Sequence, residues 1–222
     1  MNVITALETQ LRNILALGGP VVALLILISV LTLALILYKI WQFRISGVGR
    51  HKRLGQAMVA WDKGDWATAQ TRLEDSKSYL VPVVRMAFAA DRPEAIDRVD
   101  AETEDRFARL ERGLSTLDTV AQLAPLLGLF GTVLGMIEAF QKLQAAGNSV
   151  DPSLLAGGIW VALLTTAAGL AVAMPTSLIL SWFEARMRRE RVFANRAIRT
   201  VLAPGHGMAQ TDDVGTALHH GA

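Results

Sequence analysis

Apolar residues in this chain gather in three long blocks instead of recurring at the spacing of a soluble amphipathic helix. The blocks run from Val21 to Leu37, from about Val120 to Ile137, and from Ser153 to Phe183. A helix rises about 1.5 Å per residue, so each block is long enough to cross a hydrocarbon core about 30 Å thick. The pattern therefore predicts an all-α membrane protein with three transmembrane helices.

The first block has the features of a retained membrane anchor. Its apolar core is longer than the roughly 7–15 residues of a signal peptide. Its basic residues follow the core instead of preceding it, and no small-x-small cleavage motif lies between Leu37 and the basic segment. We expect this helix to stay in the membrane.

Basic residues lie on one side of the predicted spans. Lys and Arg follow the first block at positions 39, 44, 50, 52 and 53, and Arg follows the third at 186, 188, 189, 191, 196 and 199. The connection between the second and third blocks holds a single basic residue, Lys142. The positive-inside rule then places the N-terminus and this connection outside, and residues 41–118 and the C-terminus in the cytoplasm.

These patterns divide the chain into eight segments. The hydrophobic stripe of Leu110, Leu114, Leu117 and Leu123 predicts one long helix from about Pro93 into the second span. The segments are an N-terminal interfacial helix (1–16), transmembrane helices (17–40, 119–141, 154–183), a cytoplasmic helical domain (41–118), a short periplasmic loop (142–153), a cytoplasmic helical extension (184–203) and a disordered tail (204–222).

Composition argues against an enzyme. The chain has no cysteine, which excludes disulfides and thiol chemistry. Its four histidines, at positions 51, 206, 219 and 220, do not form ligand spacing with acidic residues, and we expect them to be solvent-exposed. No nucleophile with a base, phosphate loop or metal cluster is evident, and the arginines are explained by topology. We predict no catalytic residue, no metal, no cofactor and no nucleic-acid partner.

The second and third spans each have a small, hydroxyl-bearing face. On a helical wheel the two faces contain Ala121, Ala124, Gly128, Thr132, Gly135 and Ala139, and Gly158, Val161, Ala162, Thr165, Gly169, Val172 and Thr176. The opposite face of the second span is Leu- and Phe-rich. Small faces allow close helix packing, and their hydroxyls either bond to backbone or line a wet path. Both interpretations, packing alone and a polar conduit, stay open on this pattern.

Other residues of these spans have narrower expected roles. Gly128, Gly131, Gly135, Gly158 and Gly169 are the glycines expected at helix contacts. Pro125 and Pro175 each remove a backbone donor and permit a kink. Glu138 is a possible interfacial acid, and an ion pair with Lys142 at i+4 is favoured over a proton-carrying role.

Two motifs resemble a known family. The stretch "LAPLLGLFGTVLGMIEAF", followed about twenty residues later by "GGIWVALLTTAAGLAVAMP", is similar to the MotA/TolQ/ExbB proton-channel family, nearest to its ExbB and TolQ branch. The resemblance implies five copies around a central pore in the bacterial inner membrane. It also implies an ExbD/TolR-like single-span partner in that pore and a TonB- or TolA-like transducer that uses proton-motive force for envelope transport.

The resemblance also suggests a proton path. Thr132 and Thr166 align with the family's pore threonines, whereas the wheel favours Thr165, so which hydroxyl faces the lumen stays open. Many relatives have a glutamate where this chain has Val161, and a valine cannot carry a proton. The titrating acid would then belong to the partner. The alternative is a non-conducting oligomeric scaffold for a single-span partner; a flagellar stator fits poorly because MotA relatives have four spans.

Overall fold

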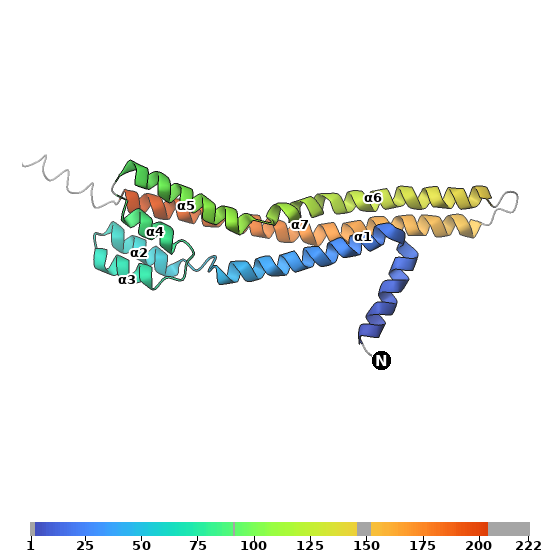
Figure 1. The fold of residues 1–222 in the computed structure, drawn as a ribbon, viewed down its shortest axis with the longest axis horizontal. Coiled ribbons are helices and arrows are strands. Elements are labelled where there is room, and N and C mark those ends of the chain that lie inside the picture. Colours follow the sequence, from blue (N-terminus) through green and yellow to red (C-terminus); the bar gives the residue numbers. More distant parts are fainter. Residues whose placement is uncertain (1–2, 91, 146–151, 204–222) are drawn as a thin grey trace, which may run out of the picture. The chain divides into compact units, whose positions relative to one another are not determined.

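The computed structural model describes residues 3–90, 92–145 and 152–203. These residues form helices and no strand, which confirms the all-α class (Figure 1). The helices are α1 (Val3–Ile45), α2 (Lys52–Asp62), α3 (Trp66–Glu74), α4 (Val81–Phe88), α5 (Pro93–Glu111), α6 (Leu114–Ala145) and α7 (Pro152–Leu202). Three stretches, Gly19–Ile45, Pro93–Ala145 and Leu155–Leu202, are long and apolar enough to cross a membrane. The chain is thus a membrane protein with three candidate spans.

The chain folds as two compact units. The first contains Met1–Tyr38 and Gly113–Phe183, and the second contains Lys39–Arg112 and Glu184–Ala222. The first unit holds the apolar helices, and the second holds most of the charged residues. The predicted disordered tail (204–222) and half of the predicted periplasmic loop (142–153) lie outside the described residues.

Helix α1 changes direction near its beginning. Gly19 has φ 64° and ψ −167°, a conformation that a glycine adopts without a Cβ penalty. Pro20 follows and has no N–H to donate to the preceding turn. In Figure 1 the first part of α1 accordingly turns away from the remainder of the helix.

The long helix predicted to begin near Pro93 is interrupted for two residues. Helix α5 ends at Glu111 and α6 begins at Leu114, with Gly113 at φ 91° between them. In the second unit, the fully buried Lys39 ammonium donates to the carbonyls of Leu110 (2.5 Å) and Arg112 (3.0 Å). This cation therefore satisfies carbonyls that the end of α5 leaves without an intrahelical donor.

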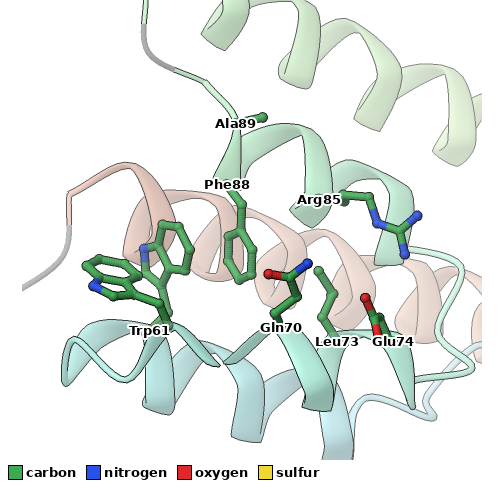
Figure 2. Close-up of a pocket in the computed structure, with 8 residues that line it drawn as sticks. Trp61, Gln70, Leu73, Glu74, Arg85, Phe88 and Ala89 are labelled. Carbon is green, nitrogen blue, oxygen red and sulfur yellow. The ribbon is translucent and has the colours of Figure 1, made fainter. Parts of the chain in front are cut away.

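Aromatic packing organises the small helices of the second unit. Gly64, at φ 80°, makes the turn between α2 and α3. Trp61 stacks on Phe88 with ring centroids 3.7 Å apart and meets Trp66 edge-on at 4.3 Å. Its indole N–H donates to the Val201 carbonyl on α7 at 3.1 Å. These helices leave a pocket of about 300 Å³ beside the stacked rings, and Figure 2 shows the residues that line it.

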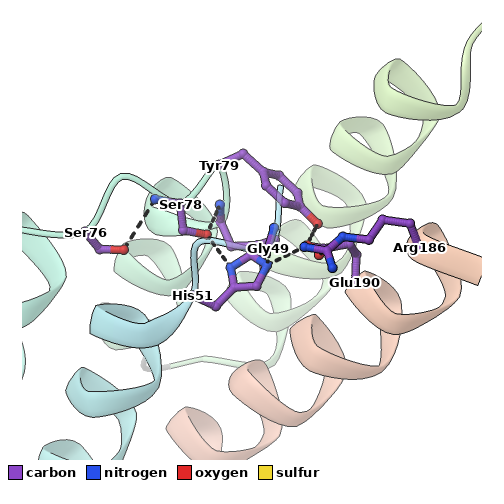
Figure 3. Close-up of polar contacts among 8 residues, drawn as sticks. Gly49, His51, Ser76, Ser78, Tyr79, Arg186 and Glu190 are labelled. Atoms are coloured by element: carbon purple, nitrogen blue, oxygen red, sulfur yellow. Dashed lines mark hydrogen bonds and ion pairs between the residues drawn. The ribbon is translucent and has the colours of Figure 1, made fainter. Parts of the chain in front are cut away.

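A buried carboxylate on α7 connects three segments of the second unit (Figure 3). Glu190, 2% exposed, accepts from His51 Nε2 at 2.5 Å and from the Tyr79 hydroxyl at 3.1 Å. Arg186 Nε lies 3.4 Å from its other oxygen. Burial, and then the charge of Glu190, raise the pKa of Tyr79, so its hydroxyl remains a donor.

The expectation that His51 is solvent-exposed is wrong. Its side chain is 11% exposed, its Nδ1 lies 2.9 Å from Ser78 Oγ, and its ring stacks on Phe193 with centroids 4.4 Å apart. Spacing along the sequence could not reveal these partners, because Glu190 lies 139 positions away. The other three histidines lie outside the described residues.

One arginine after the third apolar block pairs with acidic residues of α5. Arg191 Nη1 donates to both carboxylate oxygens of Glu104 at 2.8 Å. Its Nε and Nη2 donate to the carboxylate of Glu111 at 3.1–3.3 Å. Its guanidinium also lies 4.6 Å from the Phe107 ring centroid. These hydrogen bonds raise the pKa of Arg191, first through Glu111 and then through Glu104.

Removal of the buried charge should weaken the second unit. We expect Glu190→Gln to destabilise the protein by about 3 kcal/mol, because it leaves Arg186 and the largely buried His51 without their carboxylate. Unfolding of the detergent-solubilised protein, followed by tryptophan fluorescence, measures this change. The matched control is Glu184→Gln, which removes an exposed i,i+4 pair with Arg188 and should cost at most about 0.5 kcal/mol. Equal effects of the two variants would contradict the role given to Glu190.

Candidate functional site

The small faces of α6 and α7 meet each other within one chain. Figure 1 shows α6 running beside the first part of α7, and both helices belong to the first unit. The buried residues recur every three or four positions on both helices: Ala124, Gly128, Gly131, Gly135 and Ala139 on α6, and Ala162, Thr165, Gly169, Ala173 and Thr176 on α7. The faces that the wheel grouped by size are therefore used for packing within the chain.

At the glycine positions of the contact, the two helices approach too closely to admit a side chain. A Cβ added to Gly169 would lie 2.6 Å from the Ala124 carbonyl oxygen and 3.0 Å from Gly128 Cα. A Cβ on Gly131 would lie 2.7 Å from Thr165 Cβ. Gly135 and Gly158 face Ala162 and Ala139 in the same way. All five glycines expected at helix contacts thus lie at this one contact.

Threonine hydroxyls link the two helices at the level of Gly128. Thr165 is 2% exposed, and its Oγ1 donates to the Ala162 carbonyl of its own helix at 2.7 Å. The same hydroxyl lies 3.3 Å from the Gly128 carbonyl of α6, and Thr166 Oγ1 lies 3.4 Å from it. Each helical carbonyl has a second lone pair, so these hydroxyls are satisfied without disturbing the backbone ladder.

The three threonines differ in accessibility. Thr165 is buried between the helices, whereas Thr132 and Thr166 are half-buried. The Thr132 hydroxyl donates to the Leu129 carbonyl of its own helix at 2.6 Å. Thr132 follows Gly131, which packs on Thr165, so the three hydroxyls lie at the same level of the helix pair. The wheel placed Thr165 correctly on the small face, but that face points into the chain's own packing.

Val161 lies about one helical turn before Thr165 and lines a groove that continues toward the end of the pair where α6 ends and α7 begins. This half-buried valine lines a groove of about 360 Å³ together with Gly135, Glu138, Lys142 and Trp160, among others. Glu138 Oε1 lies 2.7 Å from Lys142 Nζ, at the i+4 spacing noted in the sequence. Among the described residues no cluster of three His, Asp or Glu side chains could hold a metal ion.

The prolines and the bulky faces complete the site. Pro125 lies inside helix α6 and Pro175 inside helix α7, and both helices continue past them. In α1, by contrast, Gly19 has non-helical φ and ψ angles. Val21 and Leu25 of α1 pack against Ala124 and Ala173 and cover one side of the pair. The large apolar residues of α6 that are exposed are Leu123, Leu126, Leu129, Phe130, Val133, Leu134, Ile137 and Phe140. Sequence reasoning missed the contribution of α1, because its apolar residues show no small face.

Comparison with known proteins identifies relatives of this chain. Residues 73–194, which include α6 and most of α7, match the model of the MotA/TolQ/ExbB proton channel family. The chain is 33% identical over 180 residues to a biopolymer transport protein ExbB homolog of Methanothermobacter thermautotrophicus, covering 78% of this chain and 62% of that protein.

Two bacterial relatives show the same likeness. Biopolymer transport protein exbB1 of Vibrio cholerae is 31% identical over 175 residues, which cover 74% of this chain and 77% of that protein. The Tol-Pal system protein TolQ of Haemophilus influenzae is 38% identical over 90 residues, which cover 38% of this chain and 39% of that protein. The chain therefore spans about three fifths of the archaeal relative and about two fifths of the TolQ protein.

A bulky side chain at the contact should separate α6 from α7. We expect Gly169→Leu to destabilise the folded chain by about 3 kcal/mol, because the added atoms meet the Ala124 carbonyl and the Gly128 backbone, which cannot move aside. Thermal unfolding in detergent measures the loss. The matched control is Gly157→Leu, since an added Cβ there has no described atom within 4 Å. If both leucine variants unfolded like the parent, the close contact would not hold the pair together.

Proposed function

Because the chain belongs to the MotA/TolQ/ExbB proton channel family, we propose that it is a subunit of a proton-driven machine in the bacterial inner membrane. In this proposal several copies, five by the family resemblance, surround a pore that holds an ExbD/TolR-like single-span partner. Protons that cross the membrane move the complex, and a TonB- or TolA-like protein transmits the work to envelope transport. The N-terminus lies in the periplasm and the C-terminus in the cytoplasm, as the basic residues predict.

The observation that supports a conduit is the set of three hydroxyls at one level of the α6–α7 pair. Thr165 is buried and its hydroxyl contacts the Gly128 carbonyl of α6, whereas Thr132 and Thr166 are half-buried. In the proposal these two hydroxyls face the pore and relay protons through water. A hydroxyl cannot store a proton at neutral pH, so a carboxylate of the partner must titrate.

A second candidate function follows from Val161. The α7 segment from Pro152 to Phe183 has no ionisable side chain, and an apolar residue stands where many relatives have a glutamate. A chain without that acid could hold a single-span partner in an oligomer without conducting protons. The two functions predict different responses to substitutions at the hydroxyls and at Val161.

Substitution of the half-buried threonines tests the conduit. We expect Thr132→Val or Thr166→Val to lower proton-driven transport about tenfold while protein levels and oligomer size stay unchanged, because a methyl replaces a hydroxyl of nearly equal volume. Transport in cells that lack their own motor proteins measures the effect. Thr119→Val is the matched control, since Thr119 lies on α6, is exposed and donates to the Ser115 carbonyl of its own helix.

A carboxylate introduced at position 161 tests the same path by adding a titrating group to it. We expect Val161→Glu to change the pH dependence of transport, because it adds a second titrating group to a path whose acid otherwise belongs to the partner. Transport measured between pH 6 and 8, about the range in which a tuned carboxylate titrates, shows the shift. Parent-like behaviour of all three variants, the two valines and the glutamate, would favour the scaffold over the conduit.

A further inference from the structure

One pocket of the second unit has an aromatic wall that is partly open to solvent (Figure 2). The Trp61 and Phe88 rings stack there, and Trp66 meets Trp61 edge-on while remaining 46% exposed. The buried Leu73 adds apolar surface to a volume of about 300 Å³. Because an apolar group in this pocket removes the ring faces from water, the lining favours an occupant with an apolar side chain.

Charged side chains border the same pocket. Glu74 on α3 and Arg85 on α4 both line it, and both are exposed. An acidic occupant can pair with Arg85 and a basic occupant with Glu74. Either pair contributes only a little binding energy, because water screens exposed ion pairs. The aromatic wall is therefore the main source of affinity, and the border charges select the sign of the occupant.

Helix α7 ends beside this pocket. The Trp61 indole N–H donates to the Val201 carbonyl at 3.1 Å, and α7 ends at the next residue, Leu202. Residues 204–222 follow in the sequence, outside the described residues. A segment that is joined to a pocket by a few residues meets it at an effective concentration of about a millimolar, so weak contacts are sufficient to hold it there.

The sequence after α7 contains an apolar side chain within reach of the pocket. Met208 is the first large apolar residue after Leu202 and lies seven positions beyond Val201. Seven residues span at most about 24 Å, and the intervening Pro-Gly-His-Gly stretch (204–207) has residues typical of turns. Methionine suits a pocket made of rings, because its unbranched chain fits irregular spaces and its sulfur makes favourable contacts with aromatic side chains.

The charged residues of the same segment are acidic. Asp212 and Asp213 are the only Asp, Glu, Lys or Arg residues between positions 204 and 222. They follow Met208 by four and five positions, a distance of at most about 18 Å. Their carboxylates can therefore reach Arg85 on the border while the methionine is in the pocket.

We propose that residues 204–213 of this chain occupy the pocket, with the Met208 side chain against the Trp66 ring and the two aspartates beside Arg85. The same segment of a second copy is a poorer occupant, because it is not joined to this pocket by a few residues. The docked segment covers aromatic surface that the helices of the second unit leave exposed.

Tryptophan quenching of a label on the segment tests the contact. The chain has no cysteine, so Gln210→Cys in the full chain creates one site for a bimane fluorophore, which tryptophan quenches on contact. The amplitudes of the quenched and unquenched lifetimes give the ratio of docked to undocked segment. We expect Met208→Ala to lower this ratio about tenfold, because the docked state loses a buried side chain and its sulfur–aromatic contacts. Met208→Leu keeps the apolar volume and should lower it much less.

Two charge variants form a matched pair at the border of the pocket. Arg85→Gln should lower the docked ratio about twofold and remove its dependence on salt, because it eliminates an exposed ion pair. Glu74→Gln removes the opposite charge from the same border and should not lower the ratio. A lower ratio in Glu74→Gln than in Arg85→Gln would contradict the acidic occupant.

The origin of the quenching is checked in a labelled chain with Trp61→Phe and Trp66→Phe, which should lose it. Equal ratios in the labelled parent and in Met208→Ala would overturn the proposal. Quenching of the tryptophan-deficient chain by unlabelled parent copies assembled with it would also overturn it, since the pocket would then hold a segment of another copy. None of these measurements requires proton flow, so failure of the docking leaves the proposed function standing, and the reverse also holds.

Discussion

The close approach of α6 and α7 is the contact on which the membrane unit depends. Lipid tails are as apolar as leucine, so burial of hydrophobic surface does little to hold two helices together in a bilayer. Dispersion contacts and hydrogen bonds between the helices must do so, and both require short distances. Glycine at positions 128, 131 and 169 makes these distances possible, and Thr165 adds hydroxyl contacts to the carbonyls. The bulky residues are left for the outer surface.

The second unit is stabilised by different interactions. Its buried charged groups lie close to partners that satisfy them: Glu190, for example, contacts His51, Tyr79 and Arg186. Arg191 is held between two glutamates of α5 and above the Phe107 ring. Such groups are costly to bury alone and tolerable when paired, so they make α7 specific for its neighbours. The second unit thus combines these charge pairs with the aromatic packing around Trp61.

The arrangement gives the three threonines unequal roles. A conduit needs hydroxyls that water can reach, and a helix contact needs hydroxyls that meet carbonyls. Thr165 meets the second requirement, while Thr132 and Thr166 retain accessible surface at the same level. The apolar Val161 lies about one turn before Thr165 and lines the groove that contains the Glu138–Lys142 ion pair.

Hydropathy and helical period determined the spans, the small faces and the five contact glycines, because these are local properties of consecutive residues. The motifs of α6 and α7 were also sufficient to recognise the family that residues 73–194 match. The tertiary structure decided that the small faces meet within one chain and that α1 covers them. It also revealed the break at Gly113, where Lys39 binds the carbonyls of Leu110 and Arg112, and the burial of His51 beside Glu190, 139 positions away. Such pairings depend on the rotation and register of distant helices, which no local pattern contains.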